Sequence, residues 1–246
     1  MKFIAPNKEL ITLLQLSAPF AVYFALTANV TGEWWMLSVL FYFLYCAIGN
    51  NVALHRYFTH KQFKVSRPTE WFFAWCATMS GLGSPISYAI PHLVHHKYPD
   101  SKLDPHGPSA GRRSLLYCFH RHLHINEKTL TSRRIFELTR TYCNLHKNYW
   151  LIVAANAGLM LAIDWKVFLF CWWLPATLTL WAVSLGIYMQ HKSGDASNTR
   201  SYSWFGWGEG LHKNHHISPG TSNTALNPGE FDYTHWIATW FIKKTE

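Results

Sequence analysis

Residues 34–60, WWMLSVLFYFLYCAIGNNVALHRYFTH, join an uncharged apolar run directly to two histidines. The run covers residues 34–54, contains no Asp, Glu, Lys or Arg, and has the roughly 20 residues that a membrane-spanning helix needs. His55 and His60 follow where this run ends. The pattern predicts a helix that crosses a bilayer and places two imidazoles at one of its surfaces.

The rest of the chain repeats this arrangement of apolar runs. Residues 10–32, 71–91, 149–163 and 167–190 also lack charged side chains, and only 14% of the 246 residues are charged. Soluble domains carry about 25% charged residues. Together with 17% aromatic residues, this composition excludes an ordinary soluble enzyme and a disordered chain. The five cysteines form no CxxC pair and are expected to be small buried apolar residues in a reducing compartment.

Nine of the fifteen histidines follow the ends of these runs. They are His55 and His60 in HRYFTH, His92, His95 and His96 in HLVHH, the single His191, and His212, His215 and His216 in HKNHH. In an HxxHH triad on a helix, all three imidazoles share one face, but adjacent members diverge by about 100°. This spacing favours two neighbouring metal ions over one. An HxxxxH pair converges only at a helix end or an unwound turn.

The topology follows from requiring all ligands to lie on one side of the membrane. We predict an all-α integral membrane protein, a single domain over residues 1–246, with four transmembrane helices at about 10–32, 34–54, 146–164 and 167–190. Segment 71–90 then lies at the interface, because Gly81, Gly83 and Pro85 interrupt it. A cytoplasmic helical cap carries the di-metal site. Residues 97–148 hold ten Lys or Arg and four Asp or Glu, which places both termini and the site on the cytoplasmic side.

The remaining histidines have simpler interpretations. His146 and His235 are expected to be interfacial or hydrogen-bonding residues. His120, His122 and His124 lie in the most basic part of the chain, and a solvated or headgroup-facing role is favoured for them. Imidazole ligands suit Fe, Zn, Cu or Ni. Because neutral imidazoles leave such a cluster cationic, nearby carboxylates are expected to orient the rings, and the candidates are Asp100, Asp104, Glu209, Glu230 and Asp232.

The motifs HRYFTH, HLVHH followed by KYPDSKLDPH, and GEGLHKNHH followed by EFDYTHW closely resemble the membrane-bound fatty acid desaturases of the acyl-CoA (delta-9 type) class. The resemblance implies a four-span helical protein with a non-haem di-iron centre, two Fe with O2 as co-substrate. It implies oxygen-dependent insertion of a cis double bond into a long acyl chain. The metal ligands it implies are His55, His60, His92, His95, His96, His191, His212, His215 and His216. Asp104 and Glu209 also match family positions, whereas an ordinary surface role is equally open for Asp100 and Glu230.

The sequence departs from the family pattern at a few positions. Ile187 stands where the animal acyl-CoA enzymes have an Asn that holds a metal-bound water, and Gln190 is the nearest polar candidate to replace it. Lys213 stands where Asn is common, and residues 217–226 lack the usual aromatic-Arg pattern. These departures leave the carrier of the acyl group open among acyl-CoA, acyl-ACP and acyl-lipid.

The expected partners follow from what the chain lacks. No Gly-rich dinucleotide motif is present, so we expect a separate electron donor, a ferredoxin or cytochrome b5. The basic loop at residues 112–140 is a candidate docking face for such acidic carriers, and attraction to anionic membrane lipid explains it equally well. We expect no nucleic-acid partner, because these charges adjoin membrane spans.

Two other functions use the same ligands. A membrane hydroxylase or ketolase acting on a lipid also uses histidine boxes and oxygen, although the GEG motif and the DPH after the second box favour desaturation. A non-catalytic metal transporter would place its ligands near mid-span, whereas eight of the nine follow the ends of apolar runs. The sequence does not determine the position of the double bond, the acyl chain length or the oligomeric state.

Overall fold

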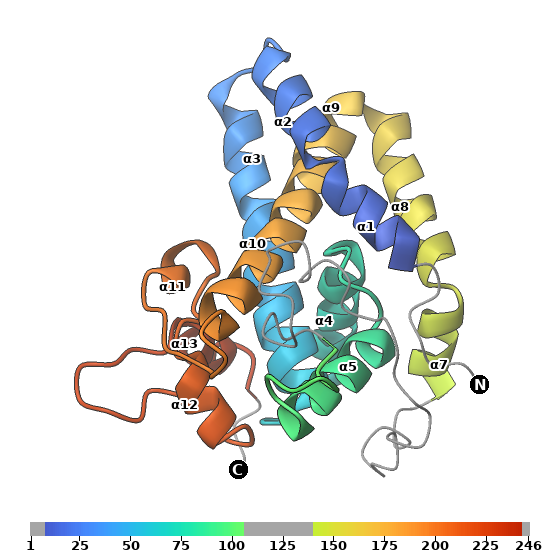
Figure 1. Ribbon diagram of the computed structural model, residues 1–246. Coiled ribbons are helices and arrows are strands. Elements are labelled where there is room, and N and C mark those ends of the chain that lie inside the picture. The colour runs from blue at the N-terminus through green and yellow to red at the C-terminus, as the bar shows by residue number, and fades with distance from the viewer. Residues whose placement is uncertain (1–7, 106–139, 243–246) are drawn as a thin grey trace.

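The computed structural model describes residues 8–105 and 140–242, and within these two ranges every regular element is a helix (Figure 1). The first six elements are α1 (Lys8–Leu16), α2 (Ala18–Thr27), α3 (Gly32–Tyr42), η1 (Phe43–Thr59), α4 (Arg67–Met79) and α5 (Pro85–Lys97). The others are α7 (Arg140–Lys147), α8 (Tyr149–Ile163), α9 (Trp165–Phe168), η4 (Leu169–Trp173), α10 (Leu174–His191), α11 (Tyr202–Phe205), α12 (His212–Ile217) and α13 (Tyr233–Thr239). The all-helical prediction is confirmed for this part of the chain. The basic loop and His120, His122 and His124 lie outside the described residues.

Three helical stretches are long and apolar enough to cross a membrane, namely Leu10–Thr27, Gly32–Thr59 and Trp165–His191. The second continues past the predicted end of the span at residue 54 and carries His55 within the same helix. The fourth predicted span contains the shorter apolar helix α8, Tyr149–Ile163. In Figure 1 these helices rise together from a lower region formed by α4, α5 and α11–α13.

The outer surface of the long helices is apolar. Phe20, Leu26 and Met36 on the long helices and Leu151 on α8 are each more than 60% exposed. Large exposed apolar areas are unusual on a protein surrounded by water. This surface suits the hydrocarbon of a bilayer. Polar contacts instead lie inside the bundle, where the Gln15 amide of α1 donates to the carbonyl of Leu180 and to the hydroxyl of Ser184 on α10.

The lower half of the second long helix is a π-helix, η1, in which hydrogen bonds span five residues rather than four. The last turn shows this directly, because the backbone N–H of His60 donates to the carbonyl of His55 at 3.1 Å. A π-helix turns less per residue than an α-helix, so residues five apart come to nearly the same face. The unwound turn that the HxxxxH pair needs is therefore part of the helix itself.

A glycine allows η1 to pack closely against α4. A Cβ at Gly49 would lie 2.6 Å from the carbonyl oxygen of Cys76, closer than any side-chain carbon can approach. Only glycine permits this contact. α4 is followed directly by α5, which carries three of the histidines. This contact therefore helps to determine where α5 lies relative to His55.

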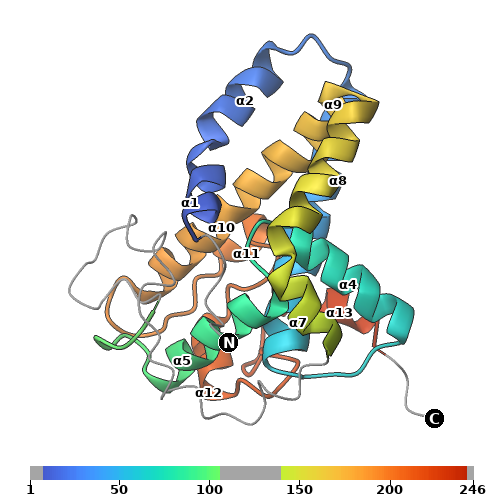
Figure 2. The same ribbon diagram turned by 90° about the vertical axis from the view of Figure 1, so that its right-hand side faces the viewer.

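Segment 71–90 forms two helices rather than one. α4 ends at Met79 and α5 begins at Pro85, and both Gly81 and Gly83 between them have positive φ. The hydroxyl of Ser84 caps α5 by accepting from the N–H of Ser87. Figure 2 shows α4 and α5 at the lower end of the long helices. The interruption predicted from the glycines is confirmed, and it leaves no continuous helix through this segment.

His146 is buried and forms a hydrogen bond. Its Nδ1 lies 2.7 Å from the hydroxyl of Ser84, so it connects α7 to the beginning of α5. The four cysteines in the described ranges are free thiols, and Cys46, Cys76 and Cys171 are buried.

Candidate metal centre

Four separate elements deliver the nine predicted histidines to one place at the lower end of the long helices. η1 supplies His55 and, just beyond its end, His60. The second half of α5 supplies His92, His95 and His96, and α10 ends at His191. The short helix α12 carries His212, His215 and His216.

The nine side chains form two groups in which the potential ligand nitrogens all lie within 4.8 Å of one another. The five-histidine group contains His55, His60, His92, His96 and His215. The four-histidine group contains His95, His191, His212 and His216. All but His96 and His216, which are partly exposed, are buried.

Adjacent histidines belong to different groups. His95 and His96 separate in this way on α5, and His215 and His216 do so on α12. This matches the divergence of about 100° between neighbouring residues of a helix. The two triads thus lie side by side, and each contributes to both groups.

Within each group, the Nε2 atoms of neighbouring rings lie 2.8–3.1 Å apart. In the five-histidine group, Nε2 of His55 and His215 are 2.9 Å apart, and those of His60 and His92 are 3.1 Å apart. In the four-histidine group, Nε2 of His191 and His212 are 2.8 Å apart. For metal–imidazole bonds of about 2.0–2.1 Å, ligands at right angles have nitrogens about 2.8–3.0 Å apart, whereas tetrahedral ligands are about 3.3–3.4 Å apart. The spacing therefore fits a metal with more than four coordination positions better than tetrahedral zinc.

Carboxylates orient one histidine of the five-histidine group and two of the four-histidine group. Glu209 lies 3.1 Å from Nδ1 of His55, Asp104 lies 2.8 Å from Nδ1 of His95 and Asp100 lies 3.0 Å from Nδ1 of His191. A carboxylate at Nδ1 keeps the proton on that nitrogen and leaves the Nε2 lone pair facing the centre of the group. The side chains therefore fit a bound metal at both groups. Asp100, for which the sequence left a surface role equally open, makes this contact as well.

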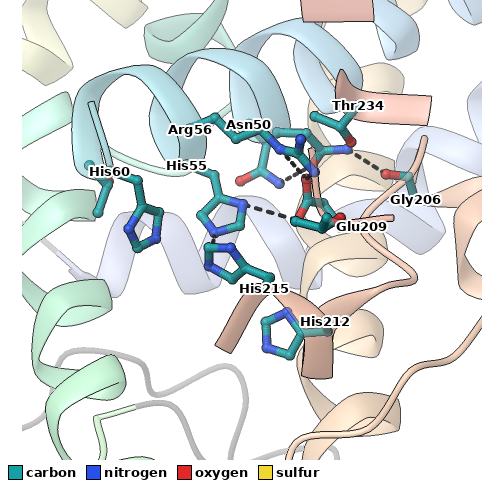
Figure 3. A network of polar contacts seen from close by, with 12 residues as sticks. Asn50, His55, Arg56, His60, Gly206, Glu209, His212, His215 and Thr234 are labelled. Atoms are coloured by element: carbon teal, nitrogen blue, oxygen red, sulfur yellow. Dashed lines mark hydrogen bonds and ion pairs between the residues drawn. The ribbon is translucent and has the colours of Figure 1, made fainter. Parts of the chain in front are cut away.

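Glu209 belongs to a buried ion-pair network shown in Figure 3. The Arg56 guanidinium donates to Glu209 at 3.1 Å and to Asp232 at 2.9 and 3.0 Å. Arg56 is only 1% exposed. Sequence reasoning missed Arg56, although it is the only charged residue in residues 34–60, and a lone charge in such a run requires a buried partner.

The other two carboxylate candidates lie farther from the imidazoles. Asp232 contacts Arg56, the Thr224 hydroxyl and the backbone N–H of His235. Glu230 accepts from the side-chain amide of Asn214 at 2.7 Å and from nearby backbone N–H groups. Neither acid contacts one of the nine histidines in the described structure.

Burial keeps the imidazoles outside the long helices neutral. Together with repulsion between neighbouring rings, it lowers the pKa of His60 to about 2 and that of His95 and His216 to about 3. The same causes lower the pKa of His96, His212 and His215. Burial alone would raise the pKa of Glu209, but Arg56 and then His55 lower it well below its usual range. Neutral imidazoles beside an ionised carboxylate are the form that binds a metal cation.

A cavity of about 60 Å³ adjoins both groups. Its polar side includes His55 and His92 of the five-histidine group and His95 and His212 of the four-histidine group. Its apolar side includes Leu82, Val183 and Ile187. Gln190, the candidate for the role of the missing Asn, also lines the cavity, but its amide donates to the backbone carbonyl of Glu209 at 2.5 Å. That amide therefore supports the Glu209 backbone.

The chain is similar to known proteins over most of its length. A family model described as fatty acid desaturase matches residues 13–228. The chain is 26% identical to Delta-9 acyl-lipid desaturase 1 of Arabidopsis thaliana, over 94% of this chain and 80% of that protein. It is 27% identical to Acyl-CoA 5-desaturase AL21 of Anemone leveillei, over 94% and 72% of the two chains. It is 25% identical to sn-1 stearoyl-lipid 9-desaturase of Anabaena variabilis, over 84% and 79%.

Proposed function

This chain belongs to the fatty acid desaturase family, and we propose that its two histidine groups hold two iron ions. It is an oxidoreductase that desaturates a fatty acyl substrate. The observation that carries the iron assignment is the convergence of nine imidazoles into two adjacent groups, with one carboxylate behind a ring of the first and two behind rings of the second. The right-angled spacing of the ring nitrogens supports iron over tetrahedral zinc.

The reaction explains why a redox-active pair is required. Removal of hydrogen from an unactivated methylene needs an oxidant made from O2. The two histidine groups would hold a redox-active metal pair, which would pass electrons from the donor to O2, a role that zinc cannot fill. Desaturation of a long saturated acyl group would introduce one cis double bond and consume O2 and two electrons. The donor is a separate protein of the ferredoxin or cytochrome b5 class.

The protein's own part is to bind and orient. Leu82, Val183 and Ile187 give the cavity beside the histidines an apolar wall, which suits the methylenes of an acyl chain and excludes bulk water. Glu209, Asp100 and Asp104 hold the imidazoles in their metal-binding tautomer. The relatives' names include both acyl-lipid and acyl-CoA desaturases, so the acyl carrier of this chain is left open.

We extend the proposal to topology, with four spans and with the metal centre and both termini on the cytoplasmic side. α7 and α8 run from Arg140 to Ile163 with a single break at residue 148, and this length supports a fourth span. The break between α4 and α5 supports a segment that does not cross. Cysteines introduced at the exposed Lys64 and Lys102 should both react with an impermeant reagent from the cytoplasmic side. Labelling from opposite sides would refute the shared site.

The central experiment combines metal analysis with product analysis. Purified active protein should contain two irons per chain, and a reproducible value of one would contradict the di-iron proposal. Membranes supplied with deuterated stearoyl and palmitoyl substrates, O2 and a matched reductase should yield a product that has lost two deuterium atoms from adjacent carbons. A hydroxylated main product that retains one of them would identify a hydroxylase instead.

A further inference from the structure

Asn50 is a buried polar residue with no role in the ion-pair network or among the histidines. It lies on η1 with 4% exposure, and its Oδ1 has no hydrogen-bond partner in the described structure. Nearly all buried acceptors in proteins are hydrogen-bonded, so such an exception requires an explanation. The position of Asn50 supplies one.

The orientation of the Asn50 amide is determined by its neighbour. The side-chain nitrogen of Asn51 donates to the backbone carbonyl of Gly206 at 2.6 Å, so the Asn51 oxygen is the atom that faces Asn50. That oxygen accepts from Nδ2 of Asn50 at 2.6 Å. The group that Asn50 has left to offer is therefore its oxygen, a hydrogen-bond acceptor.

Asn50 lines the cavity that adjoins both histidine groups. Asn50 precedes His55 by five residues, which is the span of a π-helical hydrogen bond. Both side chains therefore lie on nearly the same face of η1. Figure 3 shows Asn50 beside His55 and Glu209. A cavity of about 60 Å³ exceeds the roughly 10–15 Å³ that one water molecule requires.

We propose that Oδ1 of Asn50 accepts a hydrogen bond from a water molecule or hydroxide held in this cavity, next to the metal centre. An acceptor selects a ligand that carries a proton. Two neighbouring polar groups of the cavity are already engaged, because the Gln190 amide nitrogen donates to the Glu209 backbone and the Glu209 carboxylate binds Arg56 and His55. Ile187 faces the same cavity from α10 and offers no hydrogen bond. Asn50 is thus a positioning residue, and its role rests on the proposed metal centre.

The test measures how tightly azide binds to the cobalt-loaded protein, by titration followed in the visible absorption of Co(II). Azide carries no proton at neutral pH and has to displace the ligand that Asn50 holds. Asn50→Leu removes the hydrogen bond, so azide should bind about two- to tenfold more tightly, the range that one neutral hydrogen bond gives. Adding Ile187→Asn supplies an amide to the same cavity from α10 and should return the azide affinity toward the wild-type value.

Two further variants keep the result interpretable. Asn156→Leu removes an asparagine whose amide donates to the Ile152 carbonyl on α8, and it should leave azide affinity unchanged. Asn50→Asp keeps an acceptor, adds negative charge and loses the donor to Asn51, and the added charge should weaken azide binding. This variant tests the inference where Asn50→Leu does not fold. Unchanged azide affinity in the Asn50 variants, at full metal content, overturns the inference and leaves the metal centre intact. A wild-type protein that binds no cobalt or iron overturns both.

Discussion

The two histidine groups are built from the same side chain but are supported in different ways. In the five-histidine group, His55 is held by Glu209, which in turn depends on Arg56 and, through it, on Asp232. In the four-histidine group, the supporting acids are Asp100 and Asp104. Both arrangements direct Nε2 toward the metal position. The first requires a buried ion pair between segments about 150 residues or more apart, whereas the second uses two acids from one turn.

The local turn is itself tied together. The backbone N–H of Asp100 donates to the Asp104 carboxylate at 2.8 Å, and Asp100 has a positive φ of 57°. Residues 98–104 therefore orient histidines on two helices, α5 and α10, by a few hydrogen bonds. The comparison teaches that the acid of the five-histidine group is held by a buried ion pair between distant segments. The acids of the four-histidine group come from one short turn, and one of them, Asp100, contacts His191 at the end of α10, 91 residues away. Five variants test this difference.

The largest effect is expected from His191→Ala. This residue is the only ligand that α10 provides, and its removal leaves three imidazoles in the four-histidine group. Iron should fall from about two to about one per chain. Activity should fall by more than about 100-fold, which exceeds the loss expected when only the hydrogen-bond partner of a ligand is removed. Metal analysis and product formation measure both. His122→Ala, in the basic loop, is the control and should keep both metals, and a fully active His191→Ala protein would show that the ligand is elsewhere.

Arg56→Met should have the largest effect on stability. It leaves the Glu209 and Asp232 carboxylates buried without their cation, and breaking such a pair lowers the free energy of unfolding by about 3–5 kcal/mol. Denaturant unfolding in detergent measures the change. Arg67→Met is the matched control, because Arg67 is 65% exposed and 3.8 Å from Glu70, so it should cost less than about 1 kcal/mol. Equal losses in the two variants would show that the network is not a buried ion pair.

Glu209→Gln and Asp104→Asn should separate the two groups. Each variant weakens the partner of one ring nitrogen, in His55 or in His95, and loss of such an outer partner typically lowers metal affinity by about 10–100-fold. A metal titration should show a weakened five-histidine site in the first variant and a weakened four-histidine site in the second. Equal weakening of both sites in either variant would contradict separate support.

The smallest effect is expected from Glu230→Gln. Glu230 contacts Asn214 and backbone N–H groups at the surface, and it does not reach an imidazole. Metal affinity at both sites should stay within about twofold of wild type, because a surface change of this kind alters stability by only about 0.5 kcal/mol. A tenfold loss of metal affinity confined to the five-histidine site would contradict this expectation. It would show that Asn214, which precedes His215 on α12, passes the effect of the change to that histidine.

Much of the candidate site could be predicted from the sequence because its signals are local. Helical spacing alone indicated that His95 and His96 would face different metals, and the structure places them in different groups. The glycines at 81 and 83 indicated the break that separates α4 from α5. Charge-free runs indicated the long apolar helices, although their ends moved, since the second continues to Thr59.

The tertiary structure decided what depends on distant residues. No local pattern pairs Arg56 with Glu209 and Asp232, because that network forms only when η1 meets the chain more than 150 residues later. The role of Asp100 depended on where α10 ends, and packing brought Asn50 of η1 to the same cavity that Ile187 of α10 lines. Sequence spacing determines which face of a helix a side chain occupies. Only packing brings two such faces together, and in a buried site the partner across that contact sets the charge and tautomer of each group.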